Sequence, residues 1–450
     1  GCQNHCRETV NLFPDGQRHI SGNRCERGMD HGKKEASAPN MFAYKRKRIF
    51  EYEDLAEDEG FRGTIGIPRA LNIYENFPFW AVFFRKLGFR ILLSPFSDSR
   101  MLTLGMDSIP SESACYPAKL AHGHIEWLIS HGVKTIFYPC IYYERKEDQS
   151  SQNHYNCPMV TSYPENIRNN VENLKEKNIR YLDPFLAFTN EEVLGNGLAD
   201  FMGKAFKISK KEVLEAVREG WREFTDYRKD VEREGRRVLE WMEEHQAKGI
   251  VLAGRPYHLD PGINHGIPEM IQNFGFAVLT EDSVSSLYNT KVKLRATNQW
   301  TYHARLYAAA GYVSTRKDLE LIQLNSFGCG LDAVTIDQVQ ELMEQSGKMY
   351  TLLKIDEVNN LGAARIRVRS MMAAMKMREG KTRTCLPVLK DYERKEYTQE
   401  MQDAGYTILC TGMIQPHFDF FEAALRCSGY RLVMMRSEDQ DVLDLGLKYV

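Results

Sequence analysis

Short apolar runs alternate with amphipathic segments along the chain from Thr64 onward. This alternation is typical of βα units, in which a parallel sheet is buried between layers of helices. In the first block, which runs to about Pro184, the apolar runs predict four strands. These are residues 64–67, 89–93, 135–138 and 180–182.

The segments between these strands have apolar residues at helical spacing and predict helices over about 74–87, 113–130 and 164–177. Gly88 and Gly132 directly follow the first two predicted helices. A glycine just past a helix end can adopt the left-handed conformation without a Cβ penalty. Both helix ends are therefore fixed by local sequence.

Residues 190–247 are rich in Glu, Lys and Arg, with apolar positions at helical spacing, and we expect a pair of connecting helices there. A second βα block follows. Its predicted strands are residues 249–253, 276–280, 319–324 and 349–355, with a helix over 362–377 behind them. The expected fold is therefore α/β, with repeated parallel-sheet domains of the Rossmann or flavodoxin type and a helical connector.

An internal repeat supports this division. A helix end, a glycine, an aromatic residue and a strand recur at Gly88-Phe89, Gly275-Phe276 and Gly429-Tyr430. The first and third copies also share a Leu-Gly pair at the same spacing, Leu104-Gly105 and Leu445-Gly446.

The predicted domains are a cysteine-containing lead-in over 1–60, α/β domains over 61–189 and 248–380, the connector over 190–247, and a third α/β domain from 381 to 450. The first copy of the repeat continues into a cysteine-bearing helix, and the third copy stops before that point. The chain also opens on Gly1 rather than Met. We therefore expect a section of a larger protein, cut within its third domain.

The balance of charged residues argues against some classes of binding partner. Lys and Arg total 59 and Asp and Glu total 61, so a formal charge of −2 provides no broad attraction to nucleic acid or to anionic membranes. The most apolar stretch, residues 77–93, is interrupted by Arg85, Lys86 and Arg90, which argues against a membrane span. Ten cysteines without an export signal indicate the cytoplasm, where thiols stay free or bind metals.

Four cysteines lie at positions where parallel α/β sheets commonly form binding sites. Cys115 lies near the start of a predicted helix, Cys140 follows a predicted strand, Cys157 precedes Pro158 in the next loop, and Cys329 follows a strand of the second block between two glycines. Strand carboxyl ends and helix amino ends face the same side of such a sheet, so these thiols can converge. Each one alone would equally suit a small buried side chain.

Cys2, Cys6 and Cys25 form a separate group in the lead-in. Three thiols are one short of a tetrahedral zinc set, which His5 or a residue upstream could complete. We expect a metal knuckle here, holding either zinc or an iron-sulfur group. Cys385, Cys410 and Cys427 have no comparable setting, and we expect them to be structural.

A series of longer motifs carries a family resemblance over roughly residues 64–450. In chain order they are Ile65-Gly66-Ile67-Pro68-Arg69, Leu93-Ser94-Pro95, the run from Ile109 to Leu120, Phe137-Tyr138-Pro139-Cys140, Asn156-Cys157-Pro158, Gly254-Arg255-Pro256-Tyr257-His258, His265-Gly266-Ile267-Pro268-Glu269, Ser326-Phe327-Gly328-Cys329-Gly330, Lys354-Ile355-Asp356-Glu357 and Gly362-Ala363-Ala364-Arg365. The chain resembles the large CoA-substrate-specific enzyme activase-related proteins, whose later sections are similar to 2-hydroxyacyl-CoA dehydratase subunits such as the 2-hydroxyglutaryl-CoA dehydratase D-component.

The resemblance implies a [4Fe-4S] or double-cubane cluster, low-potential electron transfer coupled to ATP hydrolysis, and anaerobic metabolism. Its candidate ligands are Cys115, Cys140, Cys157 and Cys329, of which one could be spare. It also implies an acyl-CoA substrate or dehydratase partner and an ATPase region with an actin-like fold. No phosphate loop of that ATPase occurs in this sequence, so we expect it upstream or on a partner.

Two other interpretations remain open at this stage. The same fold could serve as a docking or regulatory section with inert cysteines, or the chain could bind only zinc through its amino-terminal cysteines. Whether the chain is itself an enzyme, as a dehydratase-like lyase or its reductase component would be, is also open.

Overall fold

In a computed structural model of the chain, residues 9–12, 18–21, 38–56, 58–288, 292–357, 361–378, 385, 395–412, 414–435 and 440–448 are described. The chain forms two compact units, Gly1–Val388 and Leu389–Val450. Each is described by itself below. The α/β class expected from the sequence is confirmed, and the finer division into domains stays a prediction.

The first sheet of the larger unit contains four parallel strands, β3 (Thr64–Ile67), β4 (Arg90–Leu93), β5 (Thr135–Phe137) and β7 (Arg180–Leu182). Their order across the sheet is β4-β3-β5-β7. All four strands predicted from apolar runs are confirmed within one or two residues. The adjacent parallel pair β6 (Cys140–Tyr143) and β8 (Phe185–Ala187) was not anticipated.

The second sheet has the same architecture, with β9 (Gly249–Ala253), β10 (Ala277–Thr280), β11 (Leu319–Ser326) and β12 (Tyr350–Ile355). Its order is β10-β9-β11-β12, so both sheets place the first strand of the block between the second and the third. Strands β9 and β11 are buried along their whole length. This burial explains why the sequence reads there as continuous apolar runs.

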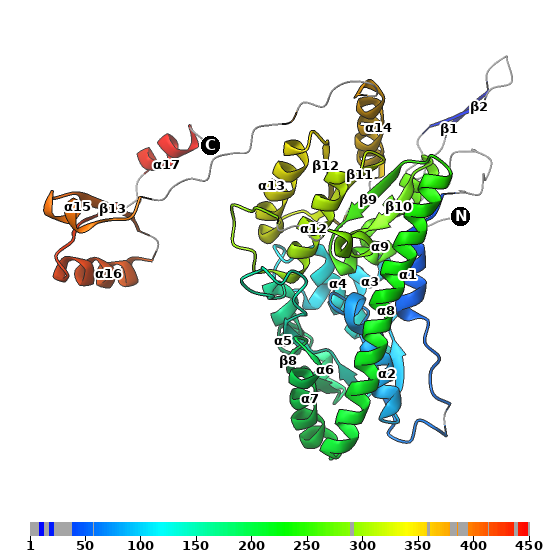
Figure 1. The fold of residues 1–450 in the computed structure, drawn as a ribbon. Coiled ribbons are helices and arrows are strands. Elements are labelled where there is room, and N and C mark those ends of the chain that lie inside the picture. Colours follow the sequence, from blue (N-terminus) through cyan, green and yellow to red (C-terminus); the bar gives the residue numbers. More distant parts are fainter. Residues whose placement is uncertain are drawn as a thin grey trace. The chain divides into compact units, whose positions relative to one another are not determined.

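Helices cover both sheets, as Figure 1 shows. The main ones are α2 (Ile73–Lys86), α4 (Tyr116–Ser130), α5 (Pro158–Asn170), α12 (Thr301–Thr315) and α13 (Gly330–Gln345). Gly88 and Gly132 have φ values of +75° and +81°, so the predicted left-handed glycine positions are confirmed. The single helix predicted over 164–177 is wrong, because α5 starts six residues earlier at Pro158 and the chain turns at Val171 before the short α6 (Asn173–Glu176).

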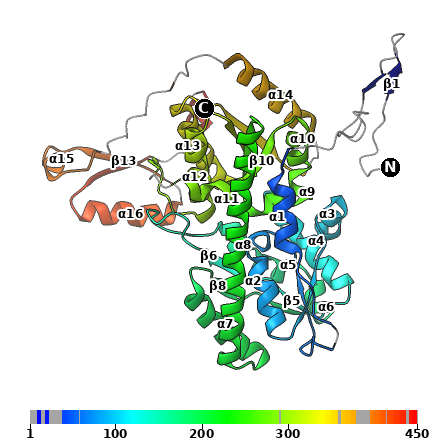
Figure 2. The same ribbon diagram turned by 45° about the vertical axis from the view of Figure 1, so that its right-hand side comes forward.

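The predicted pair of connecting helices is confirmed as α7 (Glu191–Phe206) and α8 (Lys210–Glu244). Helix α8 contacts α2 beside the first sheet and β10 in the second, and Figures 1 and 2 show it running past both. The shorter elements of this unit are β1 (Thr9–Leu12), β2 (Arg18–Ser21), α3 (Ser99–Gly105), η2 (Met106–Ser108), η3 (Pro256–Leu259), α9 (Pro261–Asn264), α10 (Ile267–Asn273), α11 (Glu281–Val284), η4 (Ser285–Leu287) and α14 (Leu361–Arg378).

The charge-rich residues 44–50 of the lead-in look solvated from the sequence, but they belong to a packed helix. Helix α1 (Met41–Phe50) is capped by Asn40 and buries Lys45 along with its apolar face. Lys45 Nζ lies 2.5 Å from an Asp282 carboxylate oxygen, and Arg46 and Arg48 also pair with carboxylates of distant elements. The charges that suggested solvent exposure are therefore neutralised by tertiary partners.

The described part of the smaller unit is an αβαβα segment with α15 (Gln399–Asp403), β13 (Thr407–Thr411), α16 (Gln415–Cys427), β14 (Arg431–Met435) and α17 (Gln440–Leu447). Its two strands pair in parallel. Gly429, between α16 and β14, has a φ of +85°, like Gly88 between α2 and β4. The repeat noticed in the sequence therefore corresponds to equivalent elements. Within the described part of this unit, large apolar side chains such as Phe420 and Leu409 are 78% and 64% exposed.

Replacing Gly123 by alanine tests the close approach of α3 and α4. A Cβ at Gly123 would overlap the backbone carbonyl of Met101, so we expect G123A to lower the free energy of unfolding by about 1–3 kcal/mol. The matched control is G203A in α7, where the nearest atom would be 3.7 Å away. Since alanine favours a helix, G203A should be neutral or stabilising by up to about 1 kcal/mol. Denaturant titrations measure both, and a G123A variant as stable as wild type would contradict the packing.

Candidate functional site

Three of the four cysteines singled out from the sequence occupy the same kind of position. Cys115, Cys157 and Cys329 are the N-cap residues of α4, α5 and α13. Backbone N–H groups in the first turn of a helix lack intrahelical partners, and the helix dipole is positive there. Each thiol therefore lies where negative charge on sulfur is favoured by the local backbone.

The three thiols share one electrostatic environment. Burial raises the pKa of Cys115 to about 11, and the thiols of Cys157 and Cys329 raise it further. Burial and Asp332 raise the pKa of Cys329, again to about 11, with a contribution from Cys157. The positive charge of Arg255 lowers the pKa of both Cys115 and Cys329. The three thiols, which come from both sheet blocks, are therefore within electrostatic range of one another.

Cys140 is placed differently. It is the first residue of β6 and is fully buried. Burial and then Glu165 raise the pKa of Cys140 to about 12, whereas Arg168 lowers it. No other thiol is among these influences. Burial and then Tyr163 raise the pKa of Tyr138, and Cys140 and Cys115 both add to this shift.

Arg255 is a buried cation held beside the three thiols. Its Nη2 lies 2.6 Å from Asp332 Oδ1 and 2.6 Å from His303 Nε2. Because a guanidinium only donates, His303 Nε2 must accept this hydrogen bond and its proton must lie on Nδ1. Burial and the charge of Arg255 lower the pKa of His303 to about 4, so the ring is neutral. Arg255 is therefore a fixed positive charge in the buried interior.

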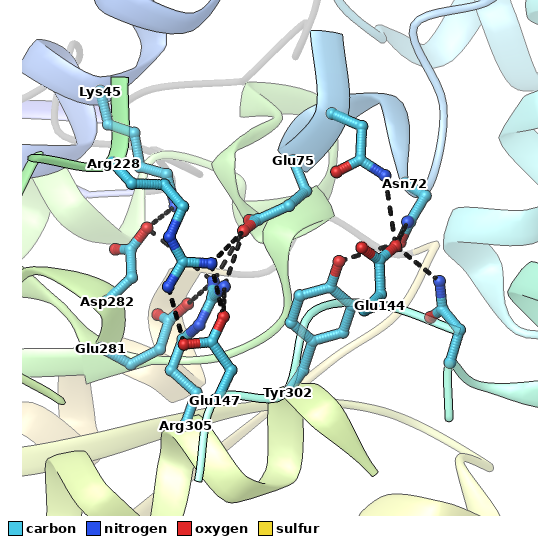
Figure 3. A network of polar contacts seen from close by, with 12 residues as sticks. Lys45, Asn72, Glu75, Glu144, Glu147, Arg228, Glu281, Asp282, Tyr302 and Arg305 are labelled. Atoms are coloured by element: carbon cyan, nitrogen blue, oxygen red, sulfur yellow. Dashed lines mark hydrogen bonds and ion pairs between the residues drawn. The ribbon is translucent and has the colours of Figure 1, made fainter. Parts of the chain in front are cut away.

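A second polar cluster fixes the backbone next to Cys157. Glu144 Oε1 accepts hydrogen bonds from the side-chain amides of Asn76 and Asn156, each at 3.2 Å, and from Asn72. The Asn156 side chain in turn accepts from the Cys157 backbone N–H at 2.9 Å. Figure 3 shows Glu144 at the centre of this cluster. Burial and then the charge of Glu75 raise the pKa of Glu144 to about 8.

Arg305 in α12 links the second block to the first. It donates to Glu75 of α2 at 2.6 Å and to Glu147 at 2.9 Å, and Arg228 of α8 also bonds Glu147 at 2.6 Å. Burial alone would raise the pKa of Glu147, but Arg228 and Arg305 hold it well below its ordinary value. These are the charged contacts on the other side of Figure 3.

Glu144, His303, Arg305 and Asp332 were not expected from the sequence as site residues. The available signal was weak: His303 and Arg305 fall among apolar residues of α12, where a polar side chain needs a buried partner. The identity of each partner depends on the tertiary fold, because the partners lie far away in the sequence.

Several other predicted site residues are not part of this arrangement. Cys2, Cys6 and Cys25, with His5, lie outside the described residues. Cys385, Cys410 and Cys427 are free thiols in the described chain, with Cys385 and Cys427 exposed. Within the described ranges, no group of three His, Cys, Asp or Glu side chains is close enough together to hold a single metal ion.

Comparison with known families adds one finding. Residues 64–284 match the CoA enzyme activase uncharacterised domain. This activase-related domain begins at β3 and ends with α11, so it contains Cys115, Cys140, Cys157 and Arg255, whereas Cys329 lies beyond it. The match supports the activase-related part of the resemblance noted in the sequence, and the more specific dehydratase assignment stays a prediction.

Other comparisons add little. A comparison with curated proteins finds no match. Among solved structures, one similar chain is a sugar binding protein from Salmonella typhimurium LT2, with 10% identity and a TM-score of 0.18 over 75% of this chain and 96% of that chain. A TM-score this low carries no argument. No helix in the described residues has the length and apolar character that a membrane crossing requires.

The raised pKa of Glu144 makes a pH-dependent stability prediction. Glu144 is protonated in the folded state up to about pH 8, against an ordinary value of 4.5. Its contribution to stability is therefore complete below about pH 4.5 and is lost as the pH rises through about 8. Relative to E144Q, the unfolding free energy of the wild type should fall across this range, by at most roughly 1.4 kcal/mol per pH unit.

Denaturant titrations between pH 5 and about 9 would measure this difference. The exposed Glu53 provides a charge control, because E53Q also removes one carboxylate but lies outside the buried cluster around Glu144. Parallel pH profiles for wild type and E144Q would contradict the buried, protonated carboxyl.

Proposed function

We propose that Cys115, Cys157 and Cys329 bind an iron-sulfur cluster and that the chain supplies electrons within an acyl-CoA dehydratase system. The observation that carries this proposal is that three helix N-cap thiols from both sheet blocks lie within electrostatic range of one another. The match of residues 64–284 to a CoA enzyme activase domain supports a role in an acyl-CoA dehydratase system. The iron-sulfur group itself rests on the chemistry of the donors.

The donor set fits a cluster better than a single ion. Thiolates are the usual ligands of iron-sulfur clusters. Around one tetrahedral zinc with Zn–S distances of about 2.3 Å, two sulfurs would lie only about 3.8 Å apart. Among the described residues no three donors are grouped that closely, although the three thiols influence one another electrostatically. A cluster spreads its ligands over several iron atoms and so suits wider spacing.

Cys140 is the spare cysteine in this proposal. Its pKa is governed by burial, Glu165 and Arg168 rather than by the other thiols. Three protein ligands on a four-iron cluster would leave one iron without a protein ligand. When bound, such a cluster supplies one-electron chemistry at low potential, which is what activation of an acyl-CoA thioester for dehydration requires.

The residues of this chain have definable roles toward the cluster. Arg255 would place a permanent positive charge beside it, held by Asp332 and the neutral His303. A nearby positive charge and hydrogen bonds to sulfur tune a cluster's potential. Glu144 would hold the backbone before Cys157 through Asn156. The dehydratase or acyl-CoA partner and an ATPase of actin-like fold belong to the same proposal.

A non-redox docking role is the second candidate, and one observation favours it. Burial raises the pKa of each of Cys115, Cys140 and Cys329 to between about 11 and about 12. Buried thiols that stay protonated are typically inert. The two functions differ in iron content, so one measurement separates them.

Serine variants of the three N-cap cysteines should lose iron. After anaerobic purification, the wild type should contain iron and acid-labile sulfide, and we expect C115S, C157S and C329S each to retain less than about half, because cluster binding requires thiolates. C140S and C427S are matched controls that should retain most of the iron. Equal iron in all five variants, or none in the wild type, would reject the cluster and favour the docking role.

Air should remove the cluster without unfolding the protein. The larger unit buries an extended apolar core of its own, so the metal need not be the main source of its stability. We expect exposure to oxygen to bleach the visible absorbance irreversibly while the far-UV circular dichroism stays near its starting value. Loss of both signals together would mean that the metal is structural.

A further inference from the structure

A polar pocket of about 550 Å³ lies beside the loop that leads from β6 to Cys157. Its walls are residues 145–150 of this loop together with parts of α8, η4 and α12. Small-molecule sites typically measure about 300–1,000 Å³, so this pocket can hold a complete metabolite. None of the three N-cap cysteines lines it.

The pocket has more positive charge than its own carboxylates match. Four cationic and three acidic side chains line it: Arg145, Lys146, Arg228 and Arg305, and Glu147, Asp148 and Glu232. Arg228 and Arg305 already share Glu147, at 2.6 and 2.9 Å. Asp148 accepts hydrogen bonds from Ser150 and Asn298.

Arg145 and Lys146 are the two cations left over. In the described part of the chain, no carboxylate lies within ion-pair distance of either side chain. Arg145 is half-buried, with its guanidinium carbon 6.0 Å from the centre of the Trp221 ring. Burial and the charge of Arg228 lower the pKa of Arg145, whereas the carboxylates of Glu147 and Glu75 raise it. An anion bound in the pocket would add a contact that neither carboxylate makes at ion-pair distance.

The remaining polar side chains suit an oxygen-rich ligand. Ser285, Ser286 and Asn298 also line the pocket and provide hydroxyl and amide groups. An arginine fork and a lysine ammonium together are a common pair for phosphate, the arginine through parallel hydrogen bonds and the lysine as a point charge. A phosphate monoester presents three strong acceptor oxygens, enough for both the arginine fork and the lysine, whereas a single carboxylate presents only two.

We propose that this pocket binds a small molecule through a phosphate group, with Arg145 and Lys146 as the anion-binding residues. The site is separate from the proposed cluster. The loop forming it is hydrogen-bonded to the start of α12, through Gln152 N–H to the Asn298 carbonyl and Thr301 N–H to the Tyr155 carbonyl. An occupied pocket should therefore hold residues 144–156 more firmly.

Calorimetric titration of the full chain with orthophosphate, pyrophosphate and ADP tests the proposal. We expect saturable binding of at least one of these probes, with affinity reduced about tenfold or more in R145Q and in K146Q, since each removes a charge-assisted contact. R145K keeps the charge without the fork and should lose less than R145Q. Unfolding midpoints of all variants verify that the fold is retained.

The matched control is R236Q, which removes an exposed arginine of α8 that does not line the pocket. Its affinity should stay within about twofold of wild type, because a distant exposed charge is screened by salt. Hydrogen exchange of residues 144–156 should also slow when the best probe is added to the wild type and not to R145Q.

Absence of saturable binding for all three probes would overturn the proposal, as would unchanged affinity in both R145Q and K146Q. Binding that sodium chloride abolishes equally in wild type and R145Q would show only a nonspecific ionic effect and would overturn it too. The titration repeated with C115S separates this site from the proposed cluster. Equal affinity in C115S, whatever its iron content, is expected for an independent pocket, and loss of binding would contradict that independence.

Discussion

The buried arginine of α12 is the contact on which the arrangement of the larger unit depends. Arg305 donates to Glu75 of the first block and to Glu147 in the loop after β6, while its own helix belongs to the second block. Removing one member of such a pair leaves an uncompensated buried charge, which costs about 3–5 kcal/mol. Cys115 and Cys157 come from the first block and Cys329 from the second, so the thiols converge only while the two blocks keep this relative position. Arg305 therefore stabilises the site without touching it.

The two sheets share a strand order but use equivalent positions differently. An arginine follows the first strand of each block, Arg69 after β3 and Arg255 after β9. The Arg69 guanidinium is placed 4.2 and 4.0 Å from the ring centres of Phe50 and Phe96 and bonds the Ser94 carbonyl. Arg255 instead pairs with Asp332 beside the thiols. Arg69 therefore packs between elements of the first block, whereas Arg255 lies at the candidate site. This difference fits the general rule that function depends on particular side chains and not on the fold that carries them.

The strands could be predicted because parallel strands buried on both faces read as apolar runs, as β9 and β11 do. Helix α1 could not, since Lys45, Arg46 and Arg48 look solvated until their carboxylate partners on distant elements are known. For Cys115 and Cys329, the sequence also predicted the edge of the sheet at which a site would lie. The separate position of Cys140 did not, because it depends on the unexpected strand β6. Glu144 is as many as 72 residues away from its amide donors, and nothing local identifies them.

Helix α8 packs along both sheets of the larger unit and restricts movement of one sheet relative to the other. At 35 residues it extends about 52 Å, and it is held closely at two glycines, Gly220 against Phe79 and Gly235 against Ser283. A hinge motion between the sheets would have to bend this helix or separate one of these two contacts. A glycine has no side chain that could stay in contact with the neighbouring element while the two move apart. We therefore expect small molecules to enter and leave through local motion of loops such as residues 144–156, and not through a hinge opening between the two sheets.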